Sequence, residues 1–177
     1  MKKIVAFGAS NSSKSINKRF ASWAASQLEN VELEMLDLND FEMPIYSIDR
    51  ETENGIHEKA QQFKDIINGA DGILISFAEY NGSYTSAFKN VLDWMSRIGR
   101  PIWSDKPLFL LGTSPGGRGA KKVLETAVST FPHQGGKVLA SFSLPSFSSN
   151  FNEEEGITNS ELEVEFSKQL ELFQKGI

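Results

Sequence analysis

The chain has 177 residues, of which 40% are hydrophobic, and its 18 Lys and Arg against 23 Asp and Glu give a net charge of −5. This length and apolar content predict one domain with a substantial core, whereas the acidic balance disfavours a nucleic-acid surface, which needs clustered cations. Because the sequence has no cysteine and only 2 histidines, it excludes disulfides and thiolate chemistry and disfavours a metal site.

The N-terminal segment lacks the features of a targeting signal. After Met1-Lys2-Lys3 only a short apolar run precedes Gly8, whereas a signal peptide needs about 7–15 apolar residues. No run approaches the roughly 18 residues of a membrane span. A soluble cytoplasmic protein, with neither a membrane nor a nucleic acid as partner, is therefore the default expectation.

Apolar runs and helical patterns alternate along the chain. In order, they predict a strand at 4–7, a helix at about 15–29, an alternating edge strand at 31–38, a loop over 39–56, a helix at about 57–69, a strand at 73–77, a helix at about 83–97, a strand at 108–111, a helix at about 119–131, a strand at 138–142, a polar loop over 146–156 and a helix at about 160–174. This alternation predicts an α/β fold with one domain over 1–177. Its expected form is a three-layer, doubly wound sheet of five parallel strands in the flavodoxin-like order 2-1-3-4-5.

In such a sheet, ligands bind beyond the carboxyl ends of the strands, where the strand order reverses. The first loop at this edge, residues 8–17, contains Ser10, Ser12, Ser13, Ser15 and Asn17 and leads into a helix. Free N–H groups and the helix dipole favour an anion there, and the hydroxyl and amide groups add donors. Helix capping explains one or two such residues but not five, so the loop is predicted to bind a phosphate.

The same loop falls short of two nucleotide-binding motifs. Residues 8–15 match the P-loop G-x-x-x-x-G-K-[ST] except that Ser13 replaces the second glycine, and neither central strand ends in an Asp for Mg²⁺. A dinucleotide fingerprint fails because Ser10 and Ser13 replace two of its glycines. Asp37, after the second strand, either mimics the ribose-binding acid or is solvated. A P-loop-like hydrolase is the third-ranked hypothesis.

Two further loops reach the same edge of the sheet. In residues 77–83, Tyr80 offers a face for a planar ring and Asn81-Gly82 allows a tight turn, although an ordinary turn is the alternative. Residues 112–119 carry four glycines, which let the backbone approach a flat ligand, and Arg118, which can hold an anion. The alternative there is a flexible loop with a surface arginine.

At these three loops the sequence resembles the NADPH-dependent FMN reductase family, which includes chromate, quinone and azo-dye reductases on a flavodoxin-like fold. The resemblance covers roughly residues 2–142. It is carried by three segments: Gly8-Ala9-Ser10 with Ser15-Ile16-Asn17, similar to G-S-x-R-x-x-S-x-N; Ala78-Glu79-Tyr80-Asn81-Gly82-Ser83 with Lys89-Asn90-Val91-Leu92-Asp93-Trp94, similar to P-E-Y-N-x-S and K-N-x-x-D-W; and residues 112–119, similar to a flavin-contacting segment. Asn11 replaces a common Arg and Ala78 the usual Pro, which weakens FMN binding unless Lys14 or Arg19 replaces the lost charge.

The resemblance implies an FMN-containing reductase with NAD(P)H as co-substrate. Hydride would pass through flavin N5 to a quinone, an azo compound, free flavin or a metal oxyanion, with no catalytic side chain and no metal. The alternative is a non-catalytic flavodoxin-type electron carrier or FMN-binding module. The implied cofactor-binding residues are Ser10, Ser15, Ile16 and Asn17 at the phosphate, Ala78, Glu79, Tyr80 and Asn81 at the ribityl chain and ring, and Ser114, Gly116, Gly117 and Arg118 at the other side of the ring.

The resemblance also implies a homodimer or homotetramer with the flavin near the interface. Trp94, Ile102 and Trp103 are the candidate interface residues, because residues 99–103 are apolar and loop-like. The alternative is that Trp103 packs within its own chain. The helix that carries Lys89 to Trp94 is expected to hold the second loop in place. The sequence identifies neither the physiological acceptor nor a preference for NADH or NADPH.

Overall fold

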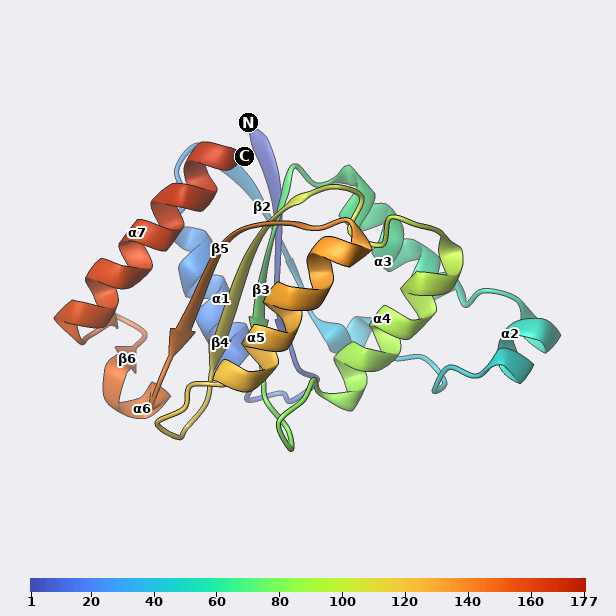
Figure 1. Cartoon of the computed structure of the whole chain (residues 1–177), viewed down its shortest axis with the longest axis horizontal. Helices are drawn as coiled ribbons and strands as arrows, with labels where there is room; N and C mark the ends of the chain where they lie inside the picture. The colour runs from blue at the N-terminus through green and yellow to red at the C-terminus, as the bar shows by residue number, and fades with distance from the viewer.

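The computed structural model describes residues 1–177 and contains a five-stranded parallel sheet with helices on both faces (Figure 1). All neighbouring strands run parallel. The order is β2-β1-β3-β4-β5, so the predicted flavodoxin-like arrangement is confirmed. The strands are β1 (Lys2–Ala9), β2 (Val31–Leu36), β3 (Gly72–Phe77), β4 (Pro107–Thr113) and β5 (Lys137–Leu144).

Side chains that alternate along β1 reach two separate cores. Ile4 and Ala6 belong to the core beneath α1 and α7, whereas Val5 and Phe7 belong to the core beneath α3, α4 and α5 (Figure 1). Burial on both faces explains why the central strands are continuous apolar runs. None of the helices combines the length and apolarity that a bilayer span requires. The covering helices are α1 (Ile16–Ser26), α3 (Glu58–Gly69), α4 (Ser86–Ile98), α5 (Lys121–Thr130) and α7 (Ser160–Gly176).

The start of α4 is tied to the end of β1. Thr85 caps the helix by accepting the N–H of Phe88 at 3.2 Å, and its hydroxyl donates to the carbonyl oxygen of Ala9 at 2.9 Å. Because Thr85 is the cap, the helix begins at Ser86 and not at about residue 83 as the apolar periodicity predicts. The bond to Ala9 fixes the loop after β3 beside the loop after β1.

The prediction of a continuous loop over 39–56 is wrong. The segment contains a 3-10 turn, η1 (Leu38–Phe41), and α2 (Ile48–Asn54), which projects from the body of the molecule (Figure 1). Ser47 caps α2 by accepting the N–H of Arg50 at 3.2 Å, and Gly55 ends it with a φ of 75°. No residue of α2 is buried, so this helix lacks the apolar periodicity that would have predicted it.

The prediction of a polar loop over 146–156 is also wrong. After a second 3-10 turn, η2 (Phe131–Gln134), and β5, the chain forms α6 (Phe147–Asn150) and the short antiparallel strands β6 (Phe151–Asn152) and β7 (Gly156–Ile157). Phe147 and Phe151 stack with their ring centroids 4.7 Å apart and join the core beneath α1. The polar residues around these two rings hide their contribution to the core.

The expectation that Trp94, Ile102 and Trp103 form a subunit interface is wrong, because all three lie inside their own chain. Their exposed fractions are 2%, 4% and 0%, respectively. Trp94 Nε1 donates to the carbonyl oxygen of Pro44 at 2.8 Å, and Trp103 Nε1 donates to Gln134 Oε1 at 3.1 Å. Buried indoles whose N–H groups have internal acceptors are core residues, so the alternative reading of Trp103 is the correct one.

Candidate functional site

The loops after β1, β3 and β4 meet at the carboxyl edge of the sheet and line a cavity of about 210 Å³. The strand order reverses at this point, where such sheets bind ligands. The predicted site residues in the cavity wall are Ser10, Ser15, Ile16, Asn17, Ala78, Glu79, Tyr80 and Ser114. Four residues outside the predicted set complete the wall: Ser12, Lys14, Thr113 and Pro115. Asn81, Gly116, Gly117 and Arg118 lie on the same loops but outside the wall.

The serine side chains of the first loop are oriented by the backbone around them. Ser10 Oγ accepts the N–H of Ser12 at 3.2 Å, and Ser12 Oγ accepts the N–H of Lys14 at 3.3 Å. Ser15 Oγ accepts the N–H of Lys18 at 3.1 Å and so caps α1. A hydroxyl that accepts a hydrogen bond still has its O–H to donate. The loop therefore supplies three oriented hydroxyl donors to the cavity.

The first turn of α1 adds two backbone donors. The N–H groups of Ile16 and Asn17 bond to no acceptor in the chain, and both residues line the cavity. Unpaired N–H groups at a helix N-terminus carry partial positive charge and attract anions. Together with the serine hydroxyls, they form a donor set of the kind that holds a phosphate.

Asn17 also ties the site to the sheet through its side chain. Its Oδ1 accepts the hydroxyl of Ser76 at 2.8 Å and the N–H of Thr113 at 3.1 Å, and its Nδ2 donates to the carbonyl oxygen of Thr113 at 3.1 Å. All three residues are buried, with Asn17 only 2% exposed. The side chain therefore links α1 to β3 and β4, and the backbone N–H of Asn17 is the group left for a ligand.

The loop after β3 presents an exposed aromatic ring. Tyr80 and Ser83 exchange backbone hydrogen bonds of 3.0 and 3.1 Å, which close a two-residue turn at Asn81 and Gly82. These two residues have φ values of 54° and 73°, the left-handed region that Asn and Gly tolerate best. The predicted tight turn is confirmed, and it leaves Tyr80 52% exposed at the cavity.

Glu79 joins the second loop to the third. Its Oε2 accepts the N–H of Val123, in the first turn of α5, at 3.0 Å. Ala120 stands at the N-cap of that helix and has no side-chain acceptor to offer, so Glu79 supplies one from another element. This bond gives the only carboxylate of the cavity wall a positioning role.

The glycine-rich loop after β4 is anchored at its base and open at its tip. The carbonyl oxygen of Gly116 accepts the N–H groups of Gly119 and Ser146 at 3.2 and 3.0 Å. A side chain at Gly116 or Gly117 would meet nothing within 4 Å, and Arg118 is exposed beyond them. The tip is therefore bare backbone beside the part of the wall formed by Ser114.

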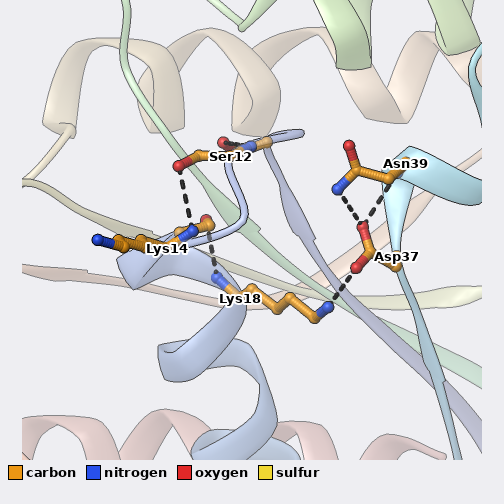
Figure 2. A network of polar contacts seen from close by, with 7 residues as sticks. Ser12, Lys14, Lys18, Asp37 and Asn39 are labelled. Carbon is orange, nitrogen blue, oxygen red and sulfur yellow. Dashed lines mark hydrogen bonds and ion pairs between the residues drawn. The ribbon is translucent and has the colours of Figure 1, made fainter.

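An ion pair connects the start of α1 to the end of β2. Figure 2 shows Lys18 Nζ against the carboxylate of Asp37, whose other oxygen accepts the N–H of Asn39 at 3.0 Å. The Lys18 bond, followed by the Asn39 bond, holds the pKa of the Asp37 carboxyl below its ordinary value. Asp37 is thus neither simply solvated nor a free acid for a ribose, because both of its oxygens have partners.

Fold and site together define a flavodoxin-like protein with a donor-rich cavity at the switch point of its sheet. The sequence profile described as NADPH-dependent FMN reductase matches residues 2–149. The chain therefore belongs to the NADPH-dependent FMN reductase family.

The chain is also similar to individual proteins that are named as reductases or oxidoreductases. The chain is 38% identical over 107 residues to the 2-hydroxy-1,4-benzoquinone reductase of a Burkholderia species, and this aligned region covers 59% of this chain and 56% of that protein. It is 32% identical over 91 residues to the NADPH:quinone oxidoreductase of Arabidopsis thaliana, covering 51% and 45%, respectively. The chain thus spans about half the length of these curated relatives. The flavoenzyme NAD(P)H:(acceptor) oxidoreductase of Paracoccus denitrificans superposes with a TM-score of 0.78 at 24% identity, covering 99% of this chain and 96% of that one, which shows a shared fold.

Proposed function

We propose that the chain binds FMN at this cavity and acts as an NAD(P)H-dependent reductase of quinone-type acceptors. One observation carries the proposal: three serine hydroxyls and two helix N–H groups surround a cavity at the switch point. Family membership supports FMN as the ligand. The names of the curated relatives support a quinone as the acceptor. Azo compounds, free flavin and metal oxyanions remain the other acceptors to be assayed.

The dimensions of the site suit the separate parts of FMN. The cavity of about 210 Å³ is smaller than the roughly 300–1,000 Å³ of whole-ligand pockets, so it suits the phosphate end of the molecule. The exposed ring of Tyr80 and the bare backbone at Gly116 and Gly117 offer surface for the planar end. Asn81 and Arg118, which lie outside the wall, belong to this outer surface.

The chain contributes binding and orientation to the reaction. FMN supplies hydride chemistry between NAD(P)H and the acceptor when it is bound. The serine hydroxyls and the N–H groups of Ile16 and Asn17 hold the phosphate. The Asn17 side chain and the Glu79 carboxylate keep the three loops in place. The N–H groups of Ala78 and Glu79 bond to no acceptor in the chain and can stabilise negative charge on the ring.

The decisive experiment is FMN titration followed by an activity assay. We expect the protein to retain a yellow, flavin-type absorbance after incubation with FMN and dialysis, and to oxidise NAD(P)H when a benzoquinone is added. Ser12→Ala should weaken FMN binding about tenfold, because it removes a donor to a charged oxygen. Ser13→Ala is the matched control, since Ser13 lies outside the wall of this cavity.

Two outcomes would contradict the proposal in different ways. A protein that retains no FMN overturns the assignment of the cavity. A protein that retains FMN but oxidises no NAD(P)H with any acceptor is instead the flavodoxin-type carrier considered above. Mg²⁺-dependent ATP binding would favour the P-loop-like hydrolase.

We also propose that the chain forms a homodimer or homotetramer through the segment that leads into the start of α2. Ile45 and Ile48 are 73% and 65% exposed on this projecting segment (Figure 1). Exposed aliphatic side chains close together are typical of protein interfaces. Light scattering on a size-exclusion column should show an oligomer that Ile45→Ser with Ile48→Ser dissociates. A monomeric wild-type protein would overturn this part of the proposal.

A further inference from the structure

The beginning of α1 and the loop before it carry three cations, and two of them are already paired. Lys18 pairs with Asp37 (Figure 2). Arg19 Nε donates to Glu153 at 2.7 Å, and its guanidinium carbon lies 5.3 Å from the ring centroid of Phe147. Arg19 is thereby held against the segment around β6, and it is absent from the wall of the cavity described above.

Lys14 is the cation of this group without an acidic partner. It takes part in none of the seven ion pairs of the chain. It also lines the cavity beside Ser10, Ser12 and Ser15. Figure 2 shows its side chain extending away from the Lys18–Asp37 pair. Lys14 is thus the one cation in the wall of the donor-rich cavity.

The backbone fixes the place from which the Lys14 side chain starts. The N–H of Lys14 donates to Ser12 Oγ at 3.3 Å, and the N–H of Ser15 donates to the carbonyl oxygen of Ser12 at 3.1 Å. These bonds close a turn directly before the helix cap. A long side chain that starts from a fixed turn keeps its charge near the cavity at little cost in backbone entropy.

Asn11 faces a different part of the molecule. It lines a separate cavity of about 160 Å³, together with Leu38, Asn39 and Asn90. It is therefore absent from the wall of the donor-rich cavity. The position at which the family pattern often has an arginine consequently cannot supply charge to that cavity in this chain.

A phosphate in the cavity needs more charge than the neutral donors provide. A phosphate monoester carries about −1.5 to −2 at neutral pH, whereas a helix N-terminus offers the equivalent of about +0.5. The one carboxylate in the wall, Glu79, has the wrong sign. Lys14 is the only side chain of the wall that can offset the remaining negative charge.

We propose that Lys14 supplies the positive charge that binds the FMN phosphate, and that this lysine makes the chain select FMN over riboflavin. This inference rests on the proposed function and assigns one residue of that site. The lysine takes over the role of the missing arginine from a position three residues further along the loop. Riboflavin has the same ring and ribityl chain but no phosphate, so its binding does not depend on Lys14.

The test compares the dissociation constants of FMN and riboflavin, measured by flavin fluorescence quenching. Lys14→Gln should weaken FMN binding roughly tenfold to 150-fold, the range expected for one charge-assisted hydrogen bond, and change riboflavin binding less than about twofold. Lys14→Arg should restore most of the FMN affinity. Arg19→Gln is the matched control, because it removes the same charge from the next turn. It should leave the ratio of the FMN affinity to the riboflavin affinity near the wild-type value.

Salt adds a second readout. Raising the salt concentration should lower the affinity for FMN relative to the affinity for riboflavin in the wild-type protein, because salt screens the charge that Lys14 contributes. In Lys14→Gln this ratio of affinities should stay nearly constant. An unchanged ratio in Lys14→Gln, or an equal loss in Arg19→Gln, overturns the inference while the proposed function stands. A wild-type protein that binds neither flavin overturns both. Circular dichroism of each variant separates loss of binding from loss of folding.

Discussion

Replacement of Asn17 by alanine should destabilise the protein more than almost any other polar substitution in the first loop. The change leaves the Ser76 hydroxyl and the N–H and carbonyl groups of Thr113 without partners in a buried site. At about 1–3 kcal/mol for each of these three unpaired buried groups, the free energy of unfolding should fall by about 3–9 kcal/mol. This loss is large against the roughly 5–15 kcal/mol by which domains are stable.

Urea unfolding followed by circular dichroism measures this loss directly. For a chain of this size, about 2–4 °C per kcal/mol also predicts a melting temperature lower by about 6 °C or more. Asn11→Ala is the matched control, since Asn11 is exposed and forms no hydrogen bond, and it should change stability by less than about 0.5 kcal/mol. If the free energies of unfolding of Asn17→Ala and Asn11→Ala differ by less than about 1 kcal/mol, the side-chain link from α1 to the sheet does not have the role assigned to it.

Substitutions at three further residues test other contacts. Lys64→Met should lower the free energy of unfolding in urea by about 2–3 kcal/mol, because buried Lys64 Nζ donates to two carbonyl oxygens and one hydroxyl of the loop before β4 at 2.7, 2.6 and 2.9 Å. A loss below about 0.5 kcal/mol would contradict this role. Glu79→Ala should cost about 1 kcal/mol through the lost cap of α5 and Glu79→Gln less, and equal losses would contradict the capping role. Lys18 lowers the pKa of Asp37, so the Lys18–Asp37 pair stabilises the protein above the ordinary carboxyl pKa of about 4, and this stabilisation disappears as the pH falls through the lowered pKa. The free energy of unfolding should therefore fall less steeply with decreasing pH in Asp37→Asn than in the wild-type protein. Equal pH dependence in the two proteins would refute this.

The order of the sheet and the position of the site follow from patterns local in the sequence. Strands β1, β3 and β4 are buried on both faces and therefore are unbroken apolar runs, each followed by a loop of small polar residues. Such runs alternating with amphipathic helices leave few possible topologies. The sequence alone therefore predicts that the three loops meet at one edge of the sheet.

The contacts that hold the loops together could not be predicted in the same way. Asn17 bonds to Thr113 across 96 positions of sequence, and Glu79 bonds to Val123 across 44. No periodicity or motif encodes such a pair, because the two partners meet only when the sheet is complete. The same reason applies to Trp94 and Trp103, whose N–H groups find acceptors in other segments and so face inward. Helix α2 was missed for the opposite reason, since it buries nothing.

Three serine side chains, those of Ser10, Ser12 and Ser15, shape the first loop. Only Gly8 is required by space there, because a Cβ at this position would lie 2.4 Å from the backbone nitrogen of Lys18. No residue from 9 to 17 has a positive φ, so the loop does not depend on the conformations that glycine permits. It turns instead through the side chain–backbone bonds of Ser10, Ser12 and Ser15. A glycine at any of these three positions would remove a bond that closes the loop and, with the same atom, a donor to the cavity. At position 10, the departure from the dinucleotide fingerprint is therefore a requirement of this site.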